Sequence, residues 1–208
     1  ASLATKACLH SKNKDAWRCV REFLQVLYER GYTDMDFSFV VPKARKKTVL
    51  PSVYSPEEIR KIESSVDTSS VSGKRNLCIL LLASRLVMRS GDIVKLSFSE
   101  VDFGNGRINY IQEKTGKPQS LPLLPEVENA LKDYICNGRP DCDEDRIFLR
   151  LEAPYRSLTT SAVRNVVNVC MRKSGVEPNG RRHASQLFRA SAATSQVNAG
   201  VSNEVVRR

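Results

Sequence analysis

The chain has 208 residues, 41% of them hydrophobic and 27% charged, which is typical of a water-soluble globular protein with one large core and part of a second domain. No apolar run approaches the roughly 20 residues that a membrane-spanning helix needs, so we expect no membrane span. The 33 Lys and Arg residues outnumber the 23 Asp and Glu residues and give a formal net charge of +10. This excess favours a polyanionic partner, and an aromatic fraction of only 7% favours a duplex over stacked single strands.

The six cysteines include no Cys-x-x-Cys pair and are accompanied by only two histidines, which argues against a structural zinc site. Cys19, Cys78 and Cys170 fall within apolar helical patterns, so we expect small buried core residues at these positions. This use of cysteine favours a reducing cytoplasm over secretion.

The first 51 residues are predicted to hold one helix and a linker. Apolar residues recur at helical spacing from Trp17 to Tyr28, Gly31 is a natural stop signal, and residues 1–41 are interpreted as the C-terminal part of a helical N-terminal domain. Residues 42–51 form a basic linker with a proline at each end. Its basic residues are Lys43, Arg45, Lys46 and Lys47. Such a run is either a solvated charged segment or a strap that follows DNA phosphates, and the sequence leaves both interpretations open.

A second domain, residues 52–208, is predicted to begin with a capping box at residues 55–58. A Ser-rich loop at residues 67–73 precedes an almost wholly apolar core helix, which is predicted to run up to Arg89. Ser90 then caps a second helix, with Asp92 in its first turn. An arginine at such a rigid junction is well placed to bind an oxyanion, because its guanidinium matches the geometry of phosphate. The alternative is that Arg89 only pairs with Asp92, and the local sequence by itself favours this pairing.

After Leu96 the periodicity indicates a small antiparallel sheet with strands near residues 101–103, 108–112 and 121–123. Lys114 lies at the tip of the second hairpin, where an ordinary solvated lysine is the default interpretation. Further helices are predicted from Pro125, from Thr159 or Thr160 to Gly175, and after Ser185, with a short extended piece at 147–149. Gln186 and Arg189 share one face of the last of these helices. The fold class predicted is mainly α with a small antiparallel β-sheet.

Three segments occur in an order that resembles the tyrosine recombinase (phage integrase) family. They are 86–92 (LVMRSGD), 112–117 (QEKTGK) and 187–194 (LFRASAAT), and 198–201 (NAGV) follows them. The resemblance covers residues 52–208 as the catalytic domain and 1–41 as the end of the core-binding domain.

The resemblance implies a specific reaction on double-stranded DNA. A tyrosine attacks a phosphodiester, forms a 3′-phosphotyrosyl link and releases a 5′-hydroxyl, without a cofactor or metal ion. Carried over to this chain, Arg89 and Arg189 hold the scissile phosphate and Lys114 protonates the leaving oxygen. Lys117 and Arg182 become phosphate contacts, together with the basic linker. The resemblance further implies a dimer or tetramer on DNA, in the cytoplasm, in a bacterial or phage-derived system.

The chain departs from the family pattern at two places around the second arginine. Gln186 and Ala190 stand where the family usually has histidine. Gln186 can donate a hydrogen bond to phosphate but cannot carry a charge. The chain stops at Arg208 inside a helical pattern, and all six tyrosines precede Arg189, so we expect that this polypeptide as given cannot form the covalent intermediate.

Three interpretations follow from these observations. The first is an integrase that cuts and rejoins DNA, and the second is a catalytically dead DNA-binding module with a recombinase-like fold. The third is a basic helical protein with unrelated chemistry. Alanine substitution of Arg89 and Arg189 separates the third interpretation from the other two. If the chemistry is unrelated, only the stability of the protein should change. If the chain is recombinase-like, cleavage or phosphate binding should weaken while the fold survives.

Overall fold

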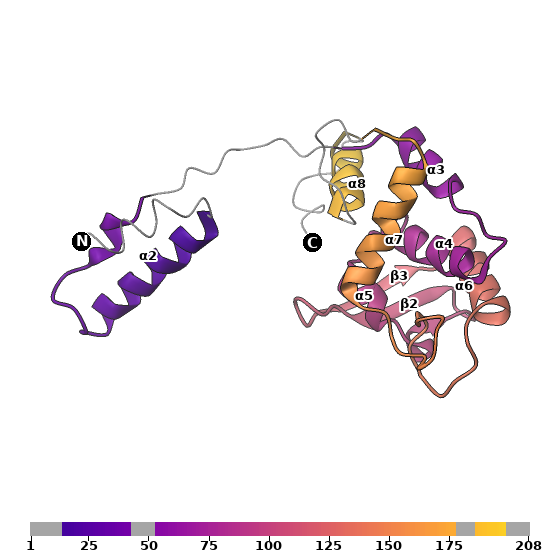
Figure 1. The fold of residues 1–208 in the computed structure, drawn as a ribbon, viewed down its shortest axis with the longest axis horizontal. Coiled ribbons are helices and arrows are strands. Elements are labelled where there is room, and N and C mark those ends of the chain that lie inside the picture. The colour runs from indigo at the N-terminus through magenta and orange to yellow at the C-terminus, as the bar shows by residue number, and fades with distance from the viewer. Residues whose placement is uncertain (1–13, 43–52, 178–185, 199–208) are drawn as a thin grey trace. The chain divides into compact units, whose positions relative to one another are not determined.

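A computed structural model describes residues 14–42, 53–177 and 186–198 of the chain (Figure 1). The chain divides into two compact units, Ala1–Leu50 and Pro51–Arg208, and the division falls inside the predicted linker. Residues 43–52 lie outside the described ranges, and with them the candidate DNA contacts Lys43, Arg45, Lys46 and Lys47. Each unit is therefore described by itself.

Within residues 14–42, the first unit contains helix α2 (Lys14–Glu29) and the 3-10 helix η1 (Phe37–Val40). Gly31 follows α2 with a positive φ of 73°, as expected for a stop signal. Trp17, Val20 and Leu24 share a half-buried strip on α2, whereas Phe23 is 61% exposed. Cys19 is exposed, so the prediction of a buried core cysteine at this position is wrong. The reason is geometric, because Cys19 lies beside this strip and not on it.

The second unit is mainly helical with one small sheet, as predicted. Its helices are α3 (Pro56–Ser64), α4 (Val71–Ser84), α5 (Ser90–Lys95), η2 (Phe98–Glu100), α6 (Pro125–Asn137), α7 (Thr160–Lys173) and α8 (Gln186–Asn198). Helix α4 is the centre of the core: residues 78–83 are all buried, and α6 and α7 pack against it (Figure 1). Cys78 and Cys170 are buried, as predicted. No helix within the described ranges is both long and apolar enough to cross a membrane.

Both ends of α4 differ from the prediction. The helix begins at Val71, where the Ser70 hydroxyl accepts from the Gly73 amide, so the preceding loop is shorter than residues 67–73. A Cβ atom on Gly73 would lie 1.7 Å from the Asp67 carbonyl oxygen, which explains the glycine inside this helix. At its other end α4 stops at Ser84 and does not reach Arg89. A non-helical connection therefore separates the core helix from Arg89.

A buried carboxylate marks the point where α4 ends. Glu63 of α3 is only 9% exposed and accepts from the Ser84 hydroxyl at 2.6 Å and from the Arg85 guanidinium at 2.9 and 2.6 Å. Paired in this way, the Glu63 charge is satisfied although it is buried. The contact ties α3 to the last turn of α4 and so fixes where the connection to Arg89 begins. The predicted capping box at Ser55 is present at the start of the same helix α3.

The three-stranded antiparallel sheet has the order β1 (Val101–Asp102), β2 (Arg107–Ile111) and β3 (Pro118–Pro122). Its register pairs Ile108 with Leu121, and the burial of β2 alternates along the strand, with Ile108 and Tyr110 inward. The prediction of the sheet is confirmed, although the third strand begins at Pro118, ahead of the predicted start at 121.

The remaining elements close the core around α4. Tyr134 of α6 stacks on Phe148 with ring centroids 5.8 Å apart, and residues 147–149 are fully buried. Thr159 caps α7, as one of the two predicted alternatives. Phe188 of α8 is 1% exposed, so this helix is seated in the same core. The predicted cap Ser185 and the segment after Asn198 lie outside the described residues.

Candidate functional site

The structure brings Arg89 and Arg189 together, although about a hundred residues separate them in the chain. Arg89 is the residue that precedes α5, and Arg189 projects from the first turn of α8. The Arg189 guanidinium donates a hydrogen bond of 2.8 Å to the carbonyl of Val87, two residues before Arg89. Burial and, second, the positive charge of Arg89 lower the pKa of Arg189. Two like charges therefore lie within mutual electrostatic range in a partly buried setting.

Arg89 is the residue that caps α5, which corrects the prediction that Ser90 does so. Its side chain makes no capping hydrogen bond, and Ser90 is the first residue inside the helix and is buried. The Arg89 Nη1 atom is buried and has no hydrogen-bond partner among the described residues. A buried donor without an acceptor costs free energy, so this guanidinium is prepared for an acceptor that the described chain does not supply.

Asp92 does not pair with Arg89 in the way that the local sequence favoured. Within the described residues no ion pair joins the two, and Oδ1 of Asp92 accepts instead from the Glu113 amide at 2.9 Å. Asp92 is 3% exposed, and the pKa of the nearby Tyr110 is raised by burial and, second, by the charge of Asp92. The cluster thus holds two guanidinium groups against one carboxylate, and its excess positive charge favours an anionic ligand.

Tyr110 lies close enough to Asp92 and both arginines to feel their charges. It is 8% exposed, and its pKa is raised by burial first and by Asp92 second, while Arg189 and Arg89 act in the opposite direction. A buried, neutral phenol beside two arginines lowers the local dielectric and so strengthens their attraction for an anion. The sequence shows Tyr110 only as an inward residue of a strand, and no sequence signal indicated its closeness to the arginines.

The connection between α4 and Arg89 contains a strained residue. Val87 has φ of 55°, the left-handed region, which is rare for a β-branched residue. Its carbonyl is the acceptor for Arg189. Such backbone conformations cost about 1–3 kcal/mol and persist where the surrounding structure imposes them. The strained residue Val87 is thus also the residue whose carbonyl positions Arg189.

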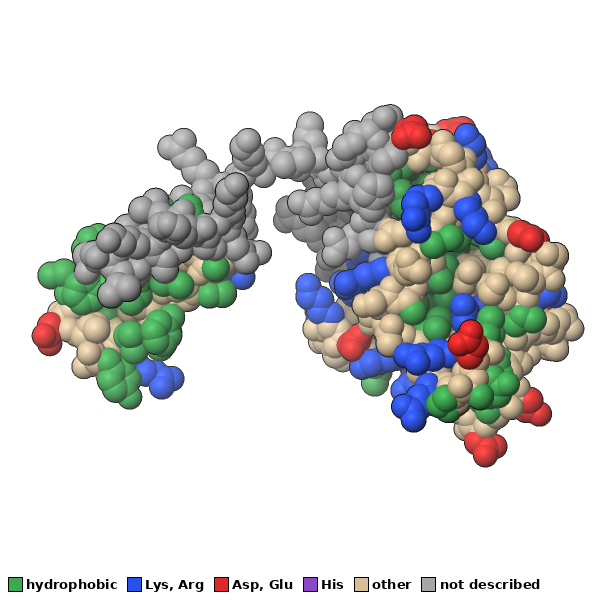
Figure 2. Space-filling view, viewed as in Figure 1, with side chains coloured by type: hydrophobic (Ala, Val, Ile, Leu, Met, Phe, Trp, Pro, Cys, Tyr) green, Lys and Arg blue, Asp and Glu red, His purple; other side chains and the backbone are tan. Residues whose placement is uncertain are grey.

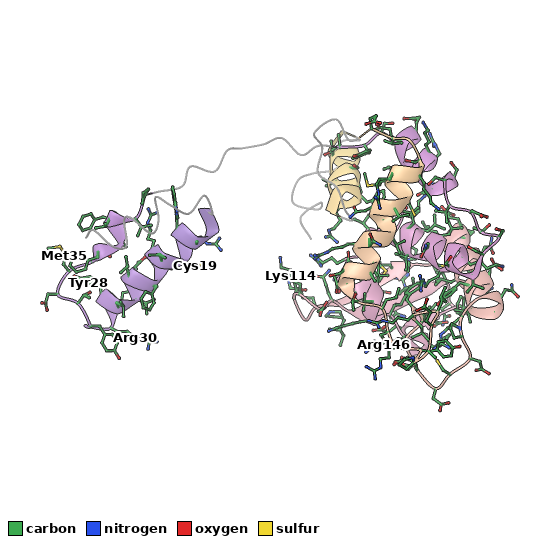
Figure 3. All side chains as sticks on the ribbon, in the orientation of Figure 1. Cys19, Tyr28, Arg30, Met35, Lys114 and Arg146 are labelled. Carbon is green, nitrogen blue, oxygen red and sulfur yellow. The ribbon has the colours of Figure 1, made fainter. Side chains whose placement is uncertain are left out.

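Lys114 is exposed at the tip of the loop between β2 and β3, which projects from the second unit (Figure 3). The loop is closed by hydrogen bonds from the Gln112 amide to the Lys117 carbonyl, 2.9 Å, and from the Gly116 amide to the Gln112 carbonyl, 2.8 Å. Within the described ranges Lys114 itself makes no hydrogen bond or ion pair. Its ammonium group is therefore available to a ligand, and Lys117 on the same loop is also exposed.

Two of the predicted site residues are not placed by the structure. Gln186 is the first residue of α8, but its side chain lies outside the described part, and Arg182 lies outside it altogether. Within the described ranges no three His, Cys, Asp or Glu side chains gather closely enough to hold a metal ion.

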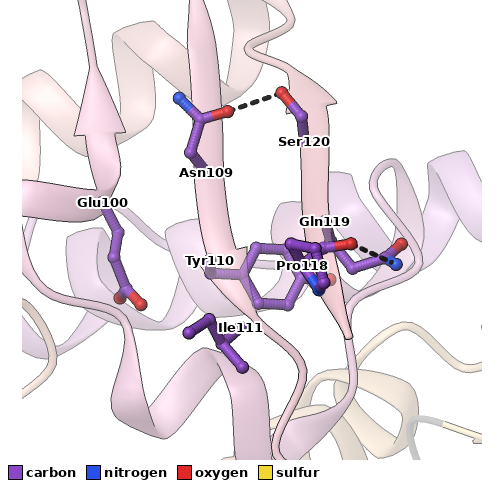
Figure 4. Close-up of a pocket in the computed structure, with 7 residues that line it drawn as sticks. All are labelled: Glu100, Asn109, Tyr110, Ile111, Pro118, Gln119 and Ser120. Atoms are coloured by element: carbon purple, nitrogen blue, oxygen red, sulfur yellow. Dashed lines mark hydrogen bonds between the residues drawn. The ribbon is translucent and has the colours of Figure 1, made fainter. Parts of the chain in front are cut away.

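The second unit carries basic side chains over one face (Figure 2) and an open hollow over its sheet. On the face of the second unit shown in Figure 2, Lys and Arg side chains spread over the middle and most Asp and Glu side chains stand nearer the edge. An open hollow of about 490 Å³ lies over the hairpin strands (Figure 4). It is lined by Glu100, Asn109, Tyr110, Ile111, Pro118, Gln119 and Ser120. Neither arginine lines this hollow, but Tyr110 belongs both to its lining and to the arginine cluster, so the hollow adjoins the candidate anion site.

The described geometry agrees with the comparisons with known proteins. The model of the phage integrase family matches residues 53–208, and the chain belongs to this family. The y4gC protein of Sinorhizobium fredii, provisionally named an integrase/recombinase, is 30% identical over 158 residues, which are 76% of this chain and 81% of that protein. The tyrosine recombinase XerD of Listeria innocua is 24% identical over 172 residues, 79% of this chain and 58% of XerD.

Solved structures show the same fold at low identity. The crystal structure of lambda integrase residues 75–356 bound to DNA has a TM-score of 0.69, at 16% identity, over 97% of this chain and 71% of that one. The XerA recombinase has a TM-score of 0.63, at 18% identity, over 90% of this chain and 63% of that one. The chain spans only part of most of these proteins, and 46% of y4rA, another Sinorhizobium fredii relative.

Proposed function

We propose that this chain binds duplex DNA and supplies the phosphate-binding machinery of a site-specific recombinase. The observation that carries the proposal is the pair of arginines, Arg89 and Arg189, held side by side with a buried Nη1 atom that lacks a partner among the described residues. A phosphodiester offers two non-bridging oxygens to such a pair. The net charge of +10 supports a polyanionic partner.

The reaction proposed is transesterification at phosphorus. A tyrosine hydroxyl attacks the phosphate, the bond to the 5′-oxygen breaks, and the 3′-phosphotyrosyl link keeps the energy of the phosphodiester. Arg89 and Arg189 stabilise the charge that develops on the non-bridging oxygens, and Lys114 gives a proton to the leaving 5′-oxygen. Gln186 would donate a hydrogen bond to the same phosphate.

The assembly proposed follows from the relatives. Lambda integrase has been crystallised on DNA as a dimer and as a tetramer. We propose that this chain also acts as a dimer or tetramer on DNA, in the cytoplasm. Residues 1–41 would be the end of a core-binding domain, and the linker lysines and arginine, with Lys117 and Arg182, would contact the DNA backbone.

Orthovanadate, which adopts the five-coordinate geometry of phosphoryl transfer, tests the site directly by isothermal titration. We expect the 208-residue chain to bind vanadate more tightly than sulfate, because the arginines are arranged for the transition state. Arg89→Ala and Arg189→Ala should each weaken vanadate binding by about tenfold or more, which corresponds to the loss of one charged hydrogen bond. Arg164→Ala on α7, which removes an exposed arginine, is the matched control and should change nothing.

The outcomes separate the candidate functions. Equal affinity for sulfate and vanadate would favour the alternative, a DNA-binding module without cleavage activity, which Gln186 in place of histidine also supports. No loss in either arginine variant would contradict a phosphate site altogether.

A nicked suicide duplex tests the covalent step. We expect that the 208-residue chain, mixed with duplexes enriched from a random pool for binding to it, forms no covalent adduct. The reason is that its six tyrosines all precede Arg189, away from the family position of the nucleophile. The measurement is denaturing gel electrophoresis, and a band of protein attached to labelled DNA would show that one of these tyrosines does attack.

A further inference from the structure

We propose that Glu113 is a positioning residue, which docks the lysine hairpin onto the first turn of α5 and so sets the place of Lys114 relative to Arg89. The proposal rests on the function proposed above. It begins with two contacts made by one residue: the Glu113 amide donates to Asp92 Oδ1 at 2.9 Å, and the Glu113 carboxylate pairs with Lys95 Nζ at 2.8 Å.

Gly91 provides a third observation at the same place. A Cβ atom built on Gly91 would lie 2.1 Å from Glu113 Oε2. The carboxylate therefore rests against the backbone of α5 at the one position without a side chain. Three positions within five residues of α5, Gly91, Asp92 and Lys95, thus hold a single residue of the hairpin. A side chain at position 91 would force the Glu113 carboxylate to shift, which the end of a flexible side chain can do at low cost, so Gly91 permits this close contact and does not by itself enforce it.

The contact between Glu113 and α5 lies close in the chain to both Lys114 and Arg89. Lys114 is the residue after Glu113, and Arg89 lies two residues before Gly91. The loop is closed on itself by the hydrogen bonds between Gln112 and Lys117. It can therefore move as one piece about its attachment to α5. Docking at Glu113 therefore connects the hairpin that carries Lys114 to the helix that begins directly after Arg89.

The energetics indicate that the contact tunes position and does not hold the fold together. The side chains of Lys95 and Glu113 are 56% and 45% exposed, and ion pairs of this kind add little to global stability. The hydrogen bond from the Glu113 amide to Asp92 is better shielded from solvent, because Asp92 is 3% exposed. Loss of the carboxylate should loosen the hairpin without unfolding the unit, and small displacements of a reacting group can reduce its contribution strongly.

The test uses Gly91→Ala, Glu113→Ala and the double variant of the 208-residue chain. Amide hydrogen exchange of residues 112–117 should become about three- to tenfold faster in Glu113→Ala, since the docked state is lost more often, and should rise by a smaller factor in Gly91→Ala, where the carboxylate only has to shift. The double variant should match Glu113→Ala, because the methyl group added at position 91 then has no carboxylate left to displace. Glu128→Ala, which removes an exposed ion pair with Lys132 on α6, is the control and should leave this exchange unchanged.

A second measurement asks whether docking acts through Lys114. Vanadate affinity should fall about threefold in Glu113→Ala, and this loss should vanish in a Lys114→Ala background, because the two residues act as one unit. An equal loss in both backgrounds would overturn the positioning role. Unchanged hydrogen exchange in both Gly91→Ala and Glu113→Ala would overturn the docking itself. If no variant of the chain binds vanadate, the proposed function fails, and the exchange experiment still decides whether the hairpin is docked.

Discussion

Replacement of Arg89 by methionine is expected to stabilise the second unit while it slows DNA strand cleavage strongly. Methionine keeps an unbranched stem but removes a buried Nη1 atom that has no partner among the described residues, and it removes the repulsion that lowers the pKa of Arg189. An unsatisfied buried donor costs about 1–3 kcal/mol, so we expect a gain of roughly 1 kcal/mol in the free energy of unfolding. Thermal unfolding followed by circular dichroism should show a midpoint about 2–4 °C higher.

Cleavage should change in the opposite direction. Loss of one preorganised cation at the phosphate should slow the reaction by about a hundred- to a thousandfold, measured in a protein that carries these residues together with a nucleophilic tyrosine. Arg89→Lys should recover only part of this loss, since a lysine cannot bind two oxygens at once. A fall in both stability and activity would indicate that Arg89 is a structural residue and would favour the interpretation of a basic helical protein with unrelated chemistry.

Arg189→Met provides a comparison within the same site. It removes the hydrogen bond to the Val87 carbonyl, so the relief of repulsion is offset by the loss of a contact that the fold does satisfy. Of the two arginines, Arg89 is the one with a buried donor that lacks a partner within the described ranges, and it also has a role in the proposed function. This asymmetry was not visible in the sequence, where the two residues differ only in their neighbours.

The sequence predicted those parts of the fold that local chemistry determines. The capping box at Ser55 and the hairpin around Gly116 each depend on a few adjacent residues, and both are present. The end of α4 was not predictable in the same way. Leu86 and Met88 are both buried and prolong the apolar pattern past Ser84, although the chain has already left the helix. A valine in a left-handed conformation gives no warning of the turn, because glycine is the residue usually found there.

The candidate site also contains features that local sequence predicts and features that depend on long-range contacts. Periodicity predicted that Arg89 lies at a junction and that Lys114 lies on a hairpin. The prediction that Arg189 lies close to Arg89 came only from the family resemblance. Long-range contacts of this kind have no local signature. The docking of Glu113 on Gly91 and Asp92 is a further example, since a glycine followed by an aspartate at a helix start is fully explained by local helix chemistry. Tertiary structure alone shows that Asp92 also accepts a hydrogen bond from the hairpin and that the Glu113 carboxylate lies against Gly91.

Replacement of Lys114 by alanine is expected to reduce strand cleavage by about a hundred- to ten-thousandfold, the usual range for loss of a general acid, with little change in the stability of the chain. Lys114 is exposed and makes no hydrogen bond or ion pair within the described ranges, so its removal breaks no contact in this part of the fold. The measurement is the rate of covalent capture of a nicked duplex by a protein that contains a nucleophilic tyrosine.

A duplex with sulfur in place of the leaving 5′-oxygen makes this prediction specific. A thiol ionises near pH 8.5, so a thiolate leaves at about neutral pH without a proton donor. The Lys114→Ala variant should therefore cleave the sulfur duplex nearly as fast as the unchanged protein, whereas Arg89→Met should remain slow on both duplexes, because the charge on the non-bridging oxygens develops in either case. Lys117→Ala is the control from the same loop, and it should weaken DNA binding slightly and show no dependence on the leaving atom. If the sulfur duplex fails to rescue Lys114→Ala, Lys114 contributes charge at the phosphate and not a proton, and the leaving oxygen must take its proton from another group.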